Sequence, residues 1–186
     1  MKLFFHFVLS NFSNTYVIGP DDGGDAIIID PGVMDLTLLN LIEKNNLYIK
    51  YILVTHKHRY HIGGIKTISK IYDAEVYSNM QLPFDIDFNK IVDGDKLQLG
   101  EHYVETYNVQ GHSPDSMIFK INNMLFTGDT IYSGYIDQDL TIKQNQTLIK
   151  RVREAIFTLD DDILVFPGHG SPSTIKLEKE FNYHFK

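Results

Sequence analysis

The sequence predicts an α/β protein folded as one domain over residues 1–186. Three observations support this: the length of 186 residues, strand-length apolar runs that alternate with helical patterns, and four apolar runs that each end in a loop carrying Asp or His. A chain of this length can bury about 70% of its surface, which is enough for one hydrophobic core. Hairpin signals within the alternation add antiparallel, α+β character.

The first half of the chain predicts a sheet with helices between its strands. The glycine-rich segment 19–24 is expected to form the turn between the second and third strands. An apolar stripe that begins at Leu36 predicts a helix ending at Asn45, and isoleucines at every third position predict another helix over 62–71 despite its two glycines. The expected strands cover residues 2–10, 14–18, 25–29, 49–54 and 75–77.

The second half predicts two hairpins, a long helix and a last buried strand. The first hairpin turns at Gly100-Glu101, and the second turns at Asn122-Asn123, residues that tolerate positive φ. A short helix is expected from Ser173. The hairpin strands cover residues 97–109, 117–121 and 124–127, the long helix covers 145–157 and the last strand covers 163–166.

The composition excludes several classes of function. With 17 basic and 24 acidic residues the formal net charge is −7, which argues against a general nucleic-acid or anionic-membrane binder. No apolar stretch approaches the roughly 18 residues of a membrane span, so we expect a soluble protein. The chain has no cysteine, so disulfides, iron-sulfur clusters and thiol nucleophiles are excluded, and the cytoplasm is the simplest location.

Five of the eight histidines fall in three loops that follow apolar strands. Without cysteine, any metal must be held by His and carboxylates, and neutral imidazoles with a carboxylate suit zinc, iron or manganese. Six candidate ligands exceed the needs of one tetrahedral ion, so two metals bridged by Asp129 are the natural number. The candidate metal ligands are His56, His58, His61, His112, Asp129 and His169.

These loops give the chain a family resemblance. It resembles the metallo-β-lactamase superfamily, and within it the compact hydrolases similar to glyoxalase II. The resemblance implies a four-layer αββα sandwich with a dinuclear site at one edge. It assigns His56, His58 and His112 to the first metal, His61 and His169 to the second, and Asp129 to both. The motifs are Asp30-Pro31-Gly32, Thr55-His56-x-His58-x-x-His61, Gly111-His112-Ser113-Pro114, Thr127-Gly128-Asp129 and Pro167-Gly168-His169-Gly170.

Tyr60 departs from the family pattern, which has Asp at that position. The missing carboxylate leaves one more positive charge at a two-metal site, so the site needs compensation. We consider four hypotheses: the second metal binds weakly and only one is held; His61, His169 and Asp129 hold it with an open position; Tyr60 ionises and ligates ferric iron; or Tyr60 packs by the site without touching metal.

The predicted function is hydrolysis of a thioester or ester of a small molecule through a metal-bound hydroxide, with Asp129 and Tyr60 as catalytic residues. Asp30 is expected to orient a histidine ligand through its other ring nitrogen. The alternative is a non-hydrolytic di-iron protein that binds dioxygen, either an oxidoreductase or a sensor with a signalling partner. We expect zinc or iron as cofactor and no nucleic-acid or membrane partner, and a homodimer stays open.

Overall fold

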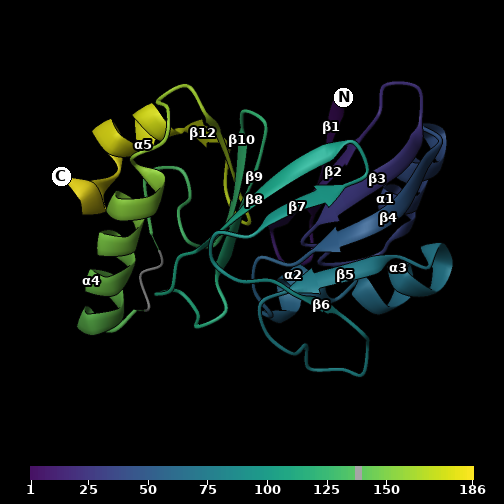
Figure 1. Ribbon diagram of the computed structural model, residues 1–186, viewed down its shortest axis with the longest axis horizontal. Helices are drawn as coiled ribbons and strands as arrows, with labels where there is room; N and C mark the ends of the chain where they lie inside the picture. Colours follow the sequence, from purple (N-terminus) through teal and green to yellow (C-terminus); the bar gives the residue numbers. More distant parts are fainter. Residues whose placement is uncertain (137–139) are drawn as a thin grey trace. The chain divides into compact units, whose positions relative to one another are not determined.

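The computed structural model describes residues 1–136 and 140–186. Its contacts divide the chain into two compact units (Figure 1). Unit 1 comprises Met1–Ile91 and Leu99–Glu101, and unit 2 comprises Val92–Gln98 and His102–Lys186. The prediction of a single domain stays a prediction. Every helix in the described ranges is too short or too polar to cross a membrane.

Unit 1 contains a six-stranded sheet in the order β1-β2-β3-β4-β5-β6. The first three strands pair antiparallel, and β3, β4, β5 and β6 pair parallel. Parallel strands need a crossover connection, and helices supply it after β3 and after β4. The strands are β1 Lys2–Val8, β2 Ser13–Gly19, β3 Gly24–Ile29, β4 Leu47–Leu53, β5 Glu75–Ser78 and β6 Asn89–Lys90.

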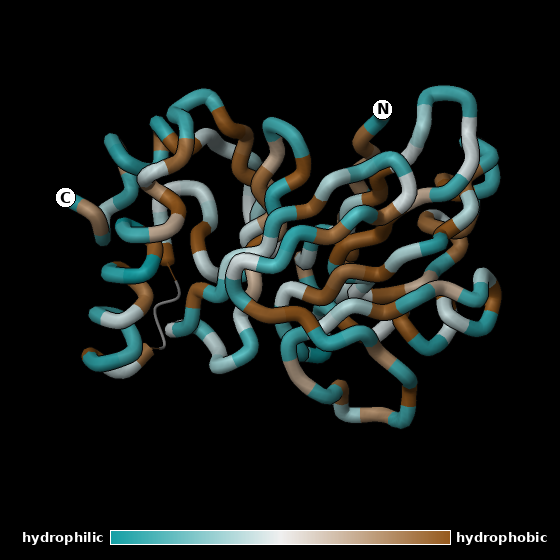
Figure 2. The backbone as a smooth tube through the Cα atoms, in the orientation of Figure 1, coloured by the Kyte–Doolittle hydropathy of each residue, from teal (hydrophilic) through white to brown (hydrophobic). Residues whose placement is uncertain are grey.

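Helices α1 (Leu36–Lys44) and α3 (Ile65–Tyr72) pack on this sheet through one hydrophobic cluster. Leu38 and Ile42 of α1 and Ile65 and Ile68 of α3 are fully buried there, with Ile28 among the strand residues of the cluster. Their spacing of three or four positions places each pair on one helix face. Figure 2 colours much of β3 and β4 brown, and the last four residues of β3 are all buried.

The helix expected over 62–71 begins later, at Ile65. A separate four-residue helix, α2 (Arg59–Ile62), precedes it, and Gly63 and Gly64 end one helix and begin the other. The helix is interrupted because Gly64 donates its N–H to the carbonyl of Pro31 at 2.8 Å instead of to a carbonyl of the preceding turn. The short strands β6 and β12 have no apolar run to reveal them and were not predicted.

Unit 2 contains the second six-stranded sheet, in the order β12-β11-β10-β9-β8-β7. The predicted turn at Asn122-Asn123 joins β9 and β10, and Asn122 has φ 52°. Only β10 and β11 pair parallel among the pairs described; β8, β9 and β12 pair antiparallel with their neighbours. The strands are β7 Lys96–Leu99, β8 His102–Asn108, β9 Met117–Ile121, β10 Met124–Gly128, β11 Leu164–Pro167 and β12 Ser173–Thr174.

Two helices cover a hydrophobic cluster in unit 2. Helix α4 (Ile142–Arg151) continues into a π-helical turn, Val152–Ile156, and α5 (Ile175–Phe181) precedes a 3-10 turn, Tyr183–Phe185. Leu148 of α4 is fully buried in this cluster. The long helix begins three residues before the predicted start, because Thr141 and Gln144 form a capping box.

Candidate metal centre

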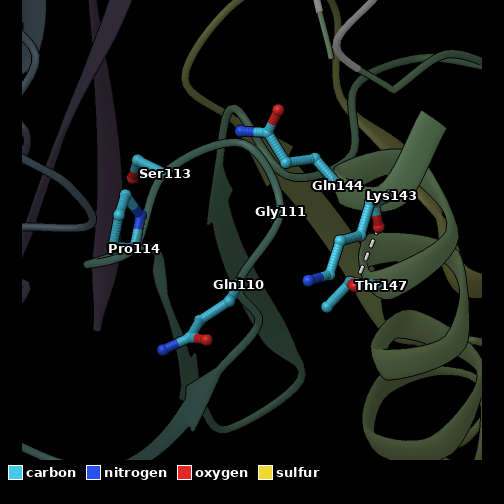
Figure 3. A pocket seen from close by; sticks show the side chains of 7 residues that line it. All are labelled: Gln110, Gly111, Ser113, Pro114, Lys143, Gln144 and Thr147. Atoms are coloured by element: carbon cyan, nitrogen blue, oxygen red, sulfur yellow. Dashed lines mark hydrogen bonds between the residues drawn. The ribbon is translucent and has the colours of Figure 1, made fainter. Parts of the chain in front are cut away.

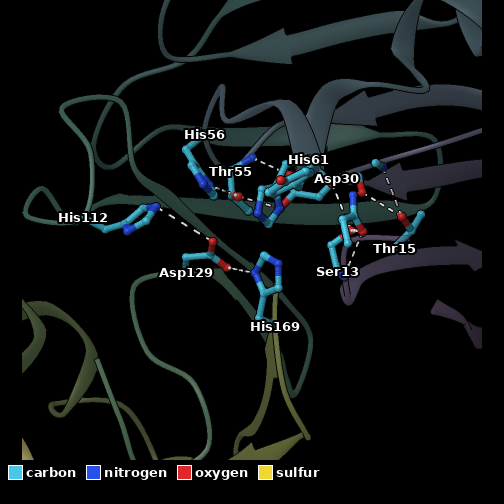
Figure 4. A network of polar contacts seen from close by, with 12 residues as sticks. Ser13, Thr15, Asp30, Thr55, His56, His61, His112, Asp129 and His169 are labelled. Atoms are coloured by element: carbon cyan, nitrogen blue, oxygen red, sulfur yellow. Dashed lines mark hydrogen bonds and ion pairs between the residues drawn. The ribbon is translucent and has the colours of Figure 1, made fainter. Parts of the chain in front are cut away.

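In unit 1, a buried carboxylate organises the ends of two strands. Asp30 follows β3 and Thr55 follows β4, so the parallel pairing brings their loops to the same edge. Asp30 accepts hydrogen bonds from the backbone N–H of Thr55 at 2.8 Å and from its hydroxyl at 2.5 Å. The Nδ1 atom of His61 lies 3.0 Å from the same carboxylate (Figure 4). Asp30 thus contacts a ring nitrogen of a predicted ligand, and its role in orienting a metal-bound histidine stays a prediction.

This network determines which nitrogen of each histidine carries a proton. A carboxylate only accepts, so Nδ1 of His61 must be the donor to Asp30. Thr55 gives its only hydroxyl proton to Asp30, so its contact of 3.0 Å with Nδ1 of His56 requires that nitrogen to donate as well. In its neutral form each ring would then carry its lone pair on Nε2, where it can ligate a metal.

The backbone around this network is tightly packed. Asp30 has φ 49°, a left-handed conformation uncommon for a residue with a side chain. A Cβ on Gly32 would lie 2.1 Å from the carbonyl oxygen of Tyr60, so only glycine fits there. The hydroxyl of Ser13 donates to that same carbonyl at 3.0 Å. Hence the loop after Asp30 is held directly against α2, the helix that carries His61.

The buried Tyr16 is close enough to Asp30 to be affected by its charge. Burial raises the pKa of Tyr16 well above its ordinary value, and the negative charge of Asp30 raises it further, against the lowering effect of a hydrogen bond with Asn14. Tyr16 therefore stays neutral at physiological pH. A neutral buried tyrosine adds no second negative charge beside Asp30.

The side chains of His58 and Tyr60 are exposed, unlike those of His56 and His61. The rings of His56 and His58 have centroids 4.6 Å apart, so the predicted ligands of unit 1 form one group. The hydroxyl of Tyr60 accepts a hydrogen bond from Arg59 at 2.8 Å, and the guanidinium lies 4.6 Å from the ring centroid. Tyr60 is thus engaged by a neighbouring cation at the surface.

In unit 2, Asp129 lies with the two other predicted ligands of that unit. Its Oδ1 is 2.8 Å from Nδ1 of His169, and its Oδ2 is 3.8 Å from Nε2 of His112 (Figure 4). Asp129 follows β10 and His169 follows β11, and these parallel strands are joined beyond their ends by the hydrogen bond from Gly168 to the carbonyl of Gly128. These three residues and Tyr132 line a pocket of about 120 Å³.

A second hollow of unit 2, of about 200 Å³, borders the loop that carries His112 (Figure 3). Lys143 lies in the first turn of α4 and brings the only cation among the lining residues. Thr147 donates its hydroxyl to the carbonyl of Lys143 at 2.9 Å. An ammonium with neighbouring hydroxyl and amide groups favours an anionic group such as a carboxylate. The lining residues are Gln110, Gly111, Ser113, Pro114, Lys143, Gln144 and Thr147.

The His and Asp side chains of unit 1 are grouped closely enough to suit a metal site. Asp30, His56 and His61 each offer a nitrogen or oxygen, and these atoms lie within 4.8 Å of one another. The chain therefore carries the His/Asp clusters of a metal-binding protein. Nitrogen and oxygen donors without thiolates suit zinc, iron and manganese.

Sequence reasoning missed Ser13 and Tyr132. Ser13 contacts Tyr60 across 47 positions, and no local pattern encodes such a contact. Tyr132 follows Asp129 by three positions, so its nearness to a predicted ligand was the available signal.

Comparisons with known proteins identify the family of this chain. The family model described as "Metallo-beta-lactamase superfamily" matches residues 10–86. Hydroxyacylglutathione hydrolase GloC of Haemophilus influenzae is 31% identical over 189 residues, covering 87% of this chain and 88% of that protein. The mitochondrial persulfide dioxygenase ETHE1 of Homo sapiens is 31% identical over 179 residues, covering 90% of this chain and 69% of that protein.

A solved structure shows the same fold. The crystal structure of the BLEG-1 B3 metallo-beta-lactamase has a TM-score of 0.89 with 23% identity, and the match covers 100% of both chains. This confirms the predicted αββα fold class. The chain belongs to the metallo-β-lactamase superfamily.

Proposed function

We propose that this protein is a metal-dependent hydrolase that cleaves a thioester or ester of a small molecule. The observation that carries the proposal is the Asp30 network, which fixes the proton positions of His56 and His61. Burying a carboxylate at a strained backbone position is costly, and the contacts that offset this cost run to His61 and, through Thr55, to His56. We assign two divalent ions, zinc or iron, to His56, His58, His61, His112, Asp129 and His169.

In the proposed reaction, the bound metal and the surrounding residues have separate roles. A bound divalent metal supplies a water of lowered pKa and polarises a carbonyl group. Asp30 and Thr55 hold His56 and His61 in the ligating form, and Asp129 provides the carboxylate that offsets positive charge in unit 2. The name of the Haemophilus influenzae relative, hydroxyacylglutathione hydrolase, supports an acyl thioester as the substrate class.

For Tyr60, the hydrogen bond from Arg59 supports the hypothesis that the side chain packs by the site without ligating metal. A phenol that accepts from a guanidinium at the surface has a partner already. We therefore propose that Tyr60 leaves the second metal with an open position and shapes access to it from the surface.

The charge of Lys143 favours one class of acyl group in the substrate. Lys143 borders the hollow next to the His112 loop, so we propose that the acyl part of the substrate carries a carboxylate that Lys143 attracts. Small-molecule thioesters of dicarboxylic acids have this chemistry.

A second candidate function is oxygen chemistry on two irons, without hydrolysis. The relation to human persulfide dioxygenase ETHE1 favours it, because that protein uses the same fold with an oxygenase activity in its name. In this alternative the substrate is dioxygen, and the protein is an oxidoreductase or a sensor.

One experiment separates the two functions. The protein is purified anaerobically without chelators, its metals are quantified, and thiol release from thioesters is followed before and after exposure to air. A colourless two-metal protein that cleaves thioesters supports the hydrolase. A visible band that appears reversibly in air, with no thiol release from either preparation, would replace the hydrolase with the oxygen-binding protein.

A further inference from the structure

A two-residue turn in unit 2 is held by many hydrogen bonds. Tyr132 and Tyr135 exchange backbone hydrogen bonds of 3.1 and 3.0 Å in an antiparallel bridge. Between them, Ser133 has φ 43° and Gly134 has φ 89°, which identifies a turn with both central residues left-handed. Such turns are tight, and here two backbone hydrogen bonds close the turn. Tyr132 is therefore presented by a fixed scaffold.

A buried carboxylate that the metal centre does not use holds this turn. Glu178 of α5 is 1% exposed, and its two oxygens lie 3.3 and 3.2 Å from the backbone nitrogen of Gly134. The hydroxyl of Ser173 donates to Oε1 at 2.5 Å, and the side-chain amide of Asn182 donates to Oε2 at 2.8 Å. A buried carboxylate is tolerated when it is satisfied in this way, so Glu178 ties the turn to α5.

Three further hydrogen bonds hold the same segment. The side-chain amide of Asn182 donates to the carbonyl of Tyr135 at 3.1 Å, and the N–H of Tyr183 donates to the carbonyl of Gly134 at 3.2 Å. On the other side, the hydroxyl of Thr127 donates to the carbonyl of Ile131 at 2.9 Å. The turn is thus fixed to both α5 and β10, the strand that leads to Asp129.

The turn places Tyr132 beside three predicted metal ligands. Tyr132 lines the pocket of about 120 Å³ with His112, Asp129 and His169, whereas Tyr135 is not among the lining residues and is 50% exposed. We propose that Tyr132 is a specificity-determining residue whose ring packs against the acyl group of the substrate, and that Glu178 is a positioning residue acting through the turn. This rests on the proposed hydrolase function.

The first test compares two acyl groups on one leaving group. Acetyl and benzoyl thioesters of N-acetylcysteamine are hydrolysed by the metal-loaded wild type and its variants. Tyr132→Ala is expected to raise KM for the benzoyl thioester about tenfold, because an aromatic contact of about 1.4 kcal/mol is lost. KM for the acetyl thioester should change less than about twofold. Tyr132→Phe keeps the ring and should resemble the wild type, and Tyr135→Ala is the matched control from the same turn.

The second test examines Glu178 through a double-mutant cycle. Glu178→Gln places an amide where Gly134, Ser173 and Asn182 all donate, so one donor meets another. It is expected to raise KM for the benzoyl thioester in the wild-type background and to have no such effect in Tyr132→Ala. A general loss of stability would instead act equally in both backgrounds. Amide hydrogen exchange at Gly134, measured by NMR, should accelerate in Glu178→Gln without any need for activity.

Three results would contradict a role of Tyr132 in substrate specificity. An unchanged ratio of the two KM values in Tyr132→Ala, an equal change in Tyr135→Ala, or an additive effect of Glu178→Gln would overturn the proposal. If the wild type cleaves neither thioester, the hydrolase function fails, and the same variants are tested for binding of benzoate and acetate by calorimetry. Loss of benzoate binding in Tyr132→Ala alone then supports the role of Tyr132, and no loss overturns it.

Discussion

The carboxylate of Asp30 lies 3.0 Å from Nδ1 of His61, so a residue at the end of β3 sets the protonation of a ring on α2. The same carboxylate reaches His56 through the hydroxyl of Thr55. The ring orientations of two histidines from one loop are thus set by one buried carboxylate. Such a partner of a metal-binding histidine normally affects metal affinity as well as stability.

Asp30→Asn should lower metal affinity by about tenfold or more, because an amide cannot accept from Thr55 and His61 in the same arrangement. Metal retained after dialysis against a graded series of chelator concentrations measures the effect. The matched control is Asp25→Asn, an exposed position on the same strand. Equal metal retention in both variants would show that the Asp30 contact does not serve metal binding.

Gly32→Ala should destabilise the fold by about 3 kcal/mol, since the added Cβ would lie 2.1 Å from the carbonyl of Tyr60 and neither backbone can yield easily. Urea unfolding followed by circular dichroism gives the midpoint and slope. Gly94→Ala serves as the control because its Cβ meets nothing within 4 Å and only the left-handed φ of 80° costs about 1 kcal/mol. Similar losses in the two variants would contradict the crowding argument.

Tyr60→Phe should leave metal content, thioester hydrolysis and the visible spectrum unchanged, because the hydroxyl interacts with Arg59 at the surface. Its effect on stability should stay within about 0.5 kcal/mol. Iron-loaded protein is the sensitive sample, since a phenolate on ferric iron absorbs visible light. A band that vanishes in Tyr60→Phe would restore Tyr60 as a ligand.

Much of the site was predictable because buried strands leave a clear pattern. β3, β4, β10 and β11 are apolar runs, and Asp30, His56, Asp129 and His169 each follow one of them. The parallel pairs β3 with β4 and β10 with β11 then bring these loops together in each unit. The periodicity of strands and the positions of His and Asp were therefore sufficient to nominate them.

What escaped prediction depends on contacts between distant residues. The break between α2 and α3 arises where Gly64 meets the backbone of Pro31, and isoleucine spacing alone predicted one continuous helix. Glu178 is 44 positions from the Gly134 amide that it accepts from. Such partners have no periodic signal, because the chain must fold before either residue can select the other.

Lys143→Gln should raise KM about threefold for a succinyl thioester and leave KM for an acetyl thioester unchanged, because an exposed ammonium contributes a modest, screened attraction. The difference should shrink as salt is raised from 50 to about 500 mM. Lys150→Gln, on the same helix, is the matched control, since Lys150 lies 3.8 Å from Glu154 and outside the hollow. A threefold rise in KM in both variants would show that the positive charge of the helix as a whole, and not Lys143 in the hollow, attracts the substrate.

The protein should lose stability as pH rises through the range from 10 to about 12. Burial, with a hydrogen bond to Glu75 and its negative charge, raises the pKa of Tyr77 to about 12, and burial raises those of Tyr16 and Tyr72 well above their ordinary value of 10. The unfolded chain releases these protons near pH 10 while the folded protein keeps them, so deprotonation favours unfolding. Tyr77→Phe removes one such group and should flatten the decline of urea midpoints across this range, whereas Tyr183→Phe, an exposed control, should not. A decline that is equally steep in both variants would remove Tyr77 from the explanation.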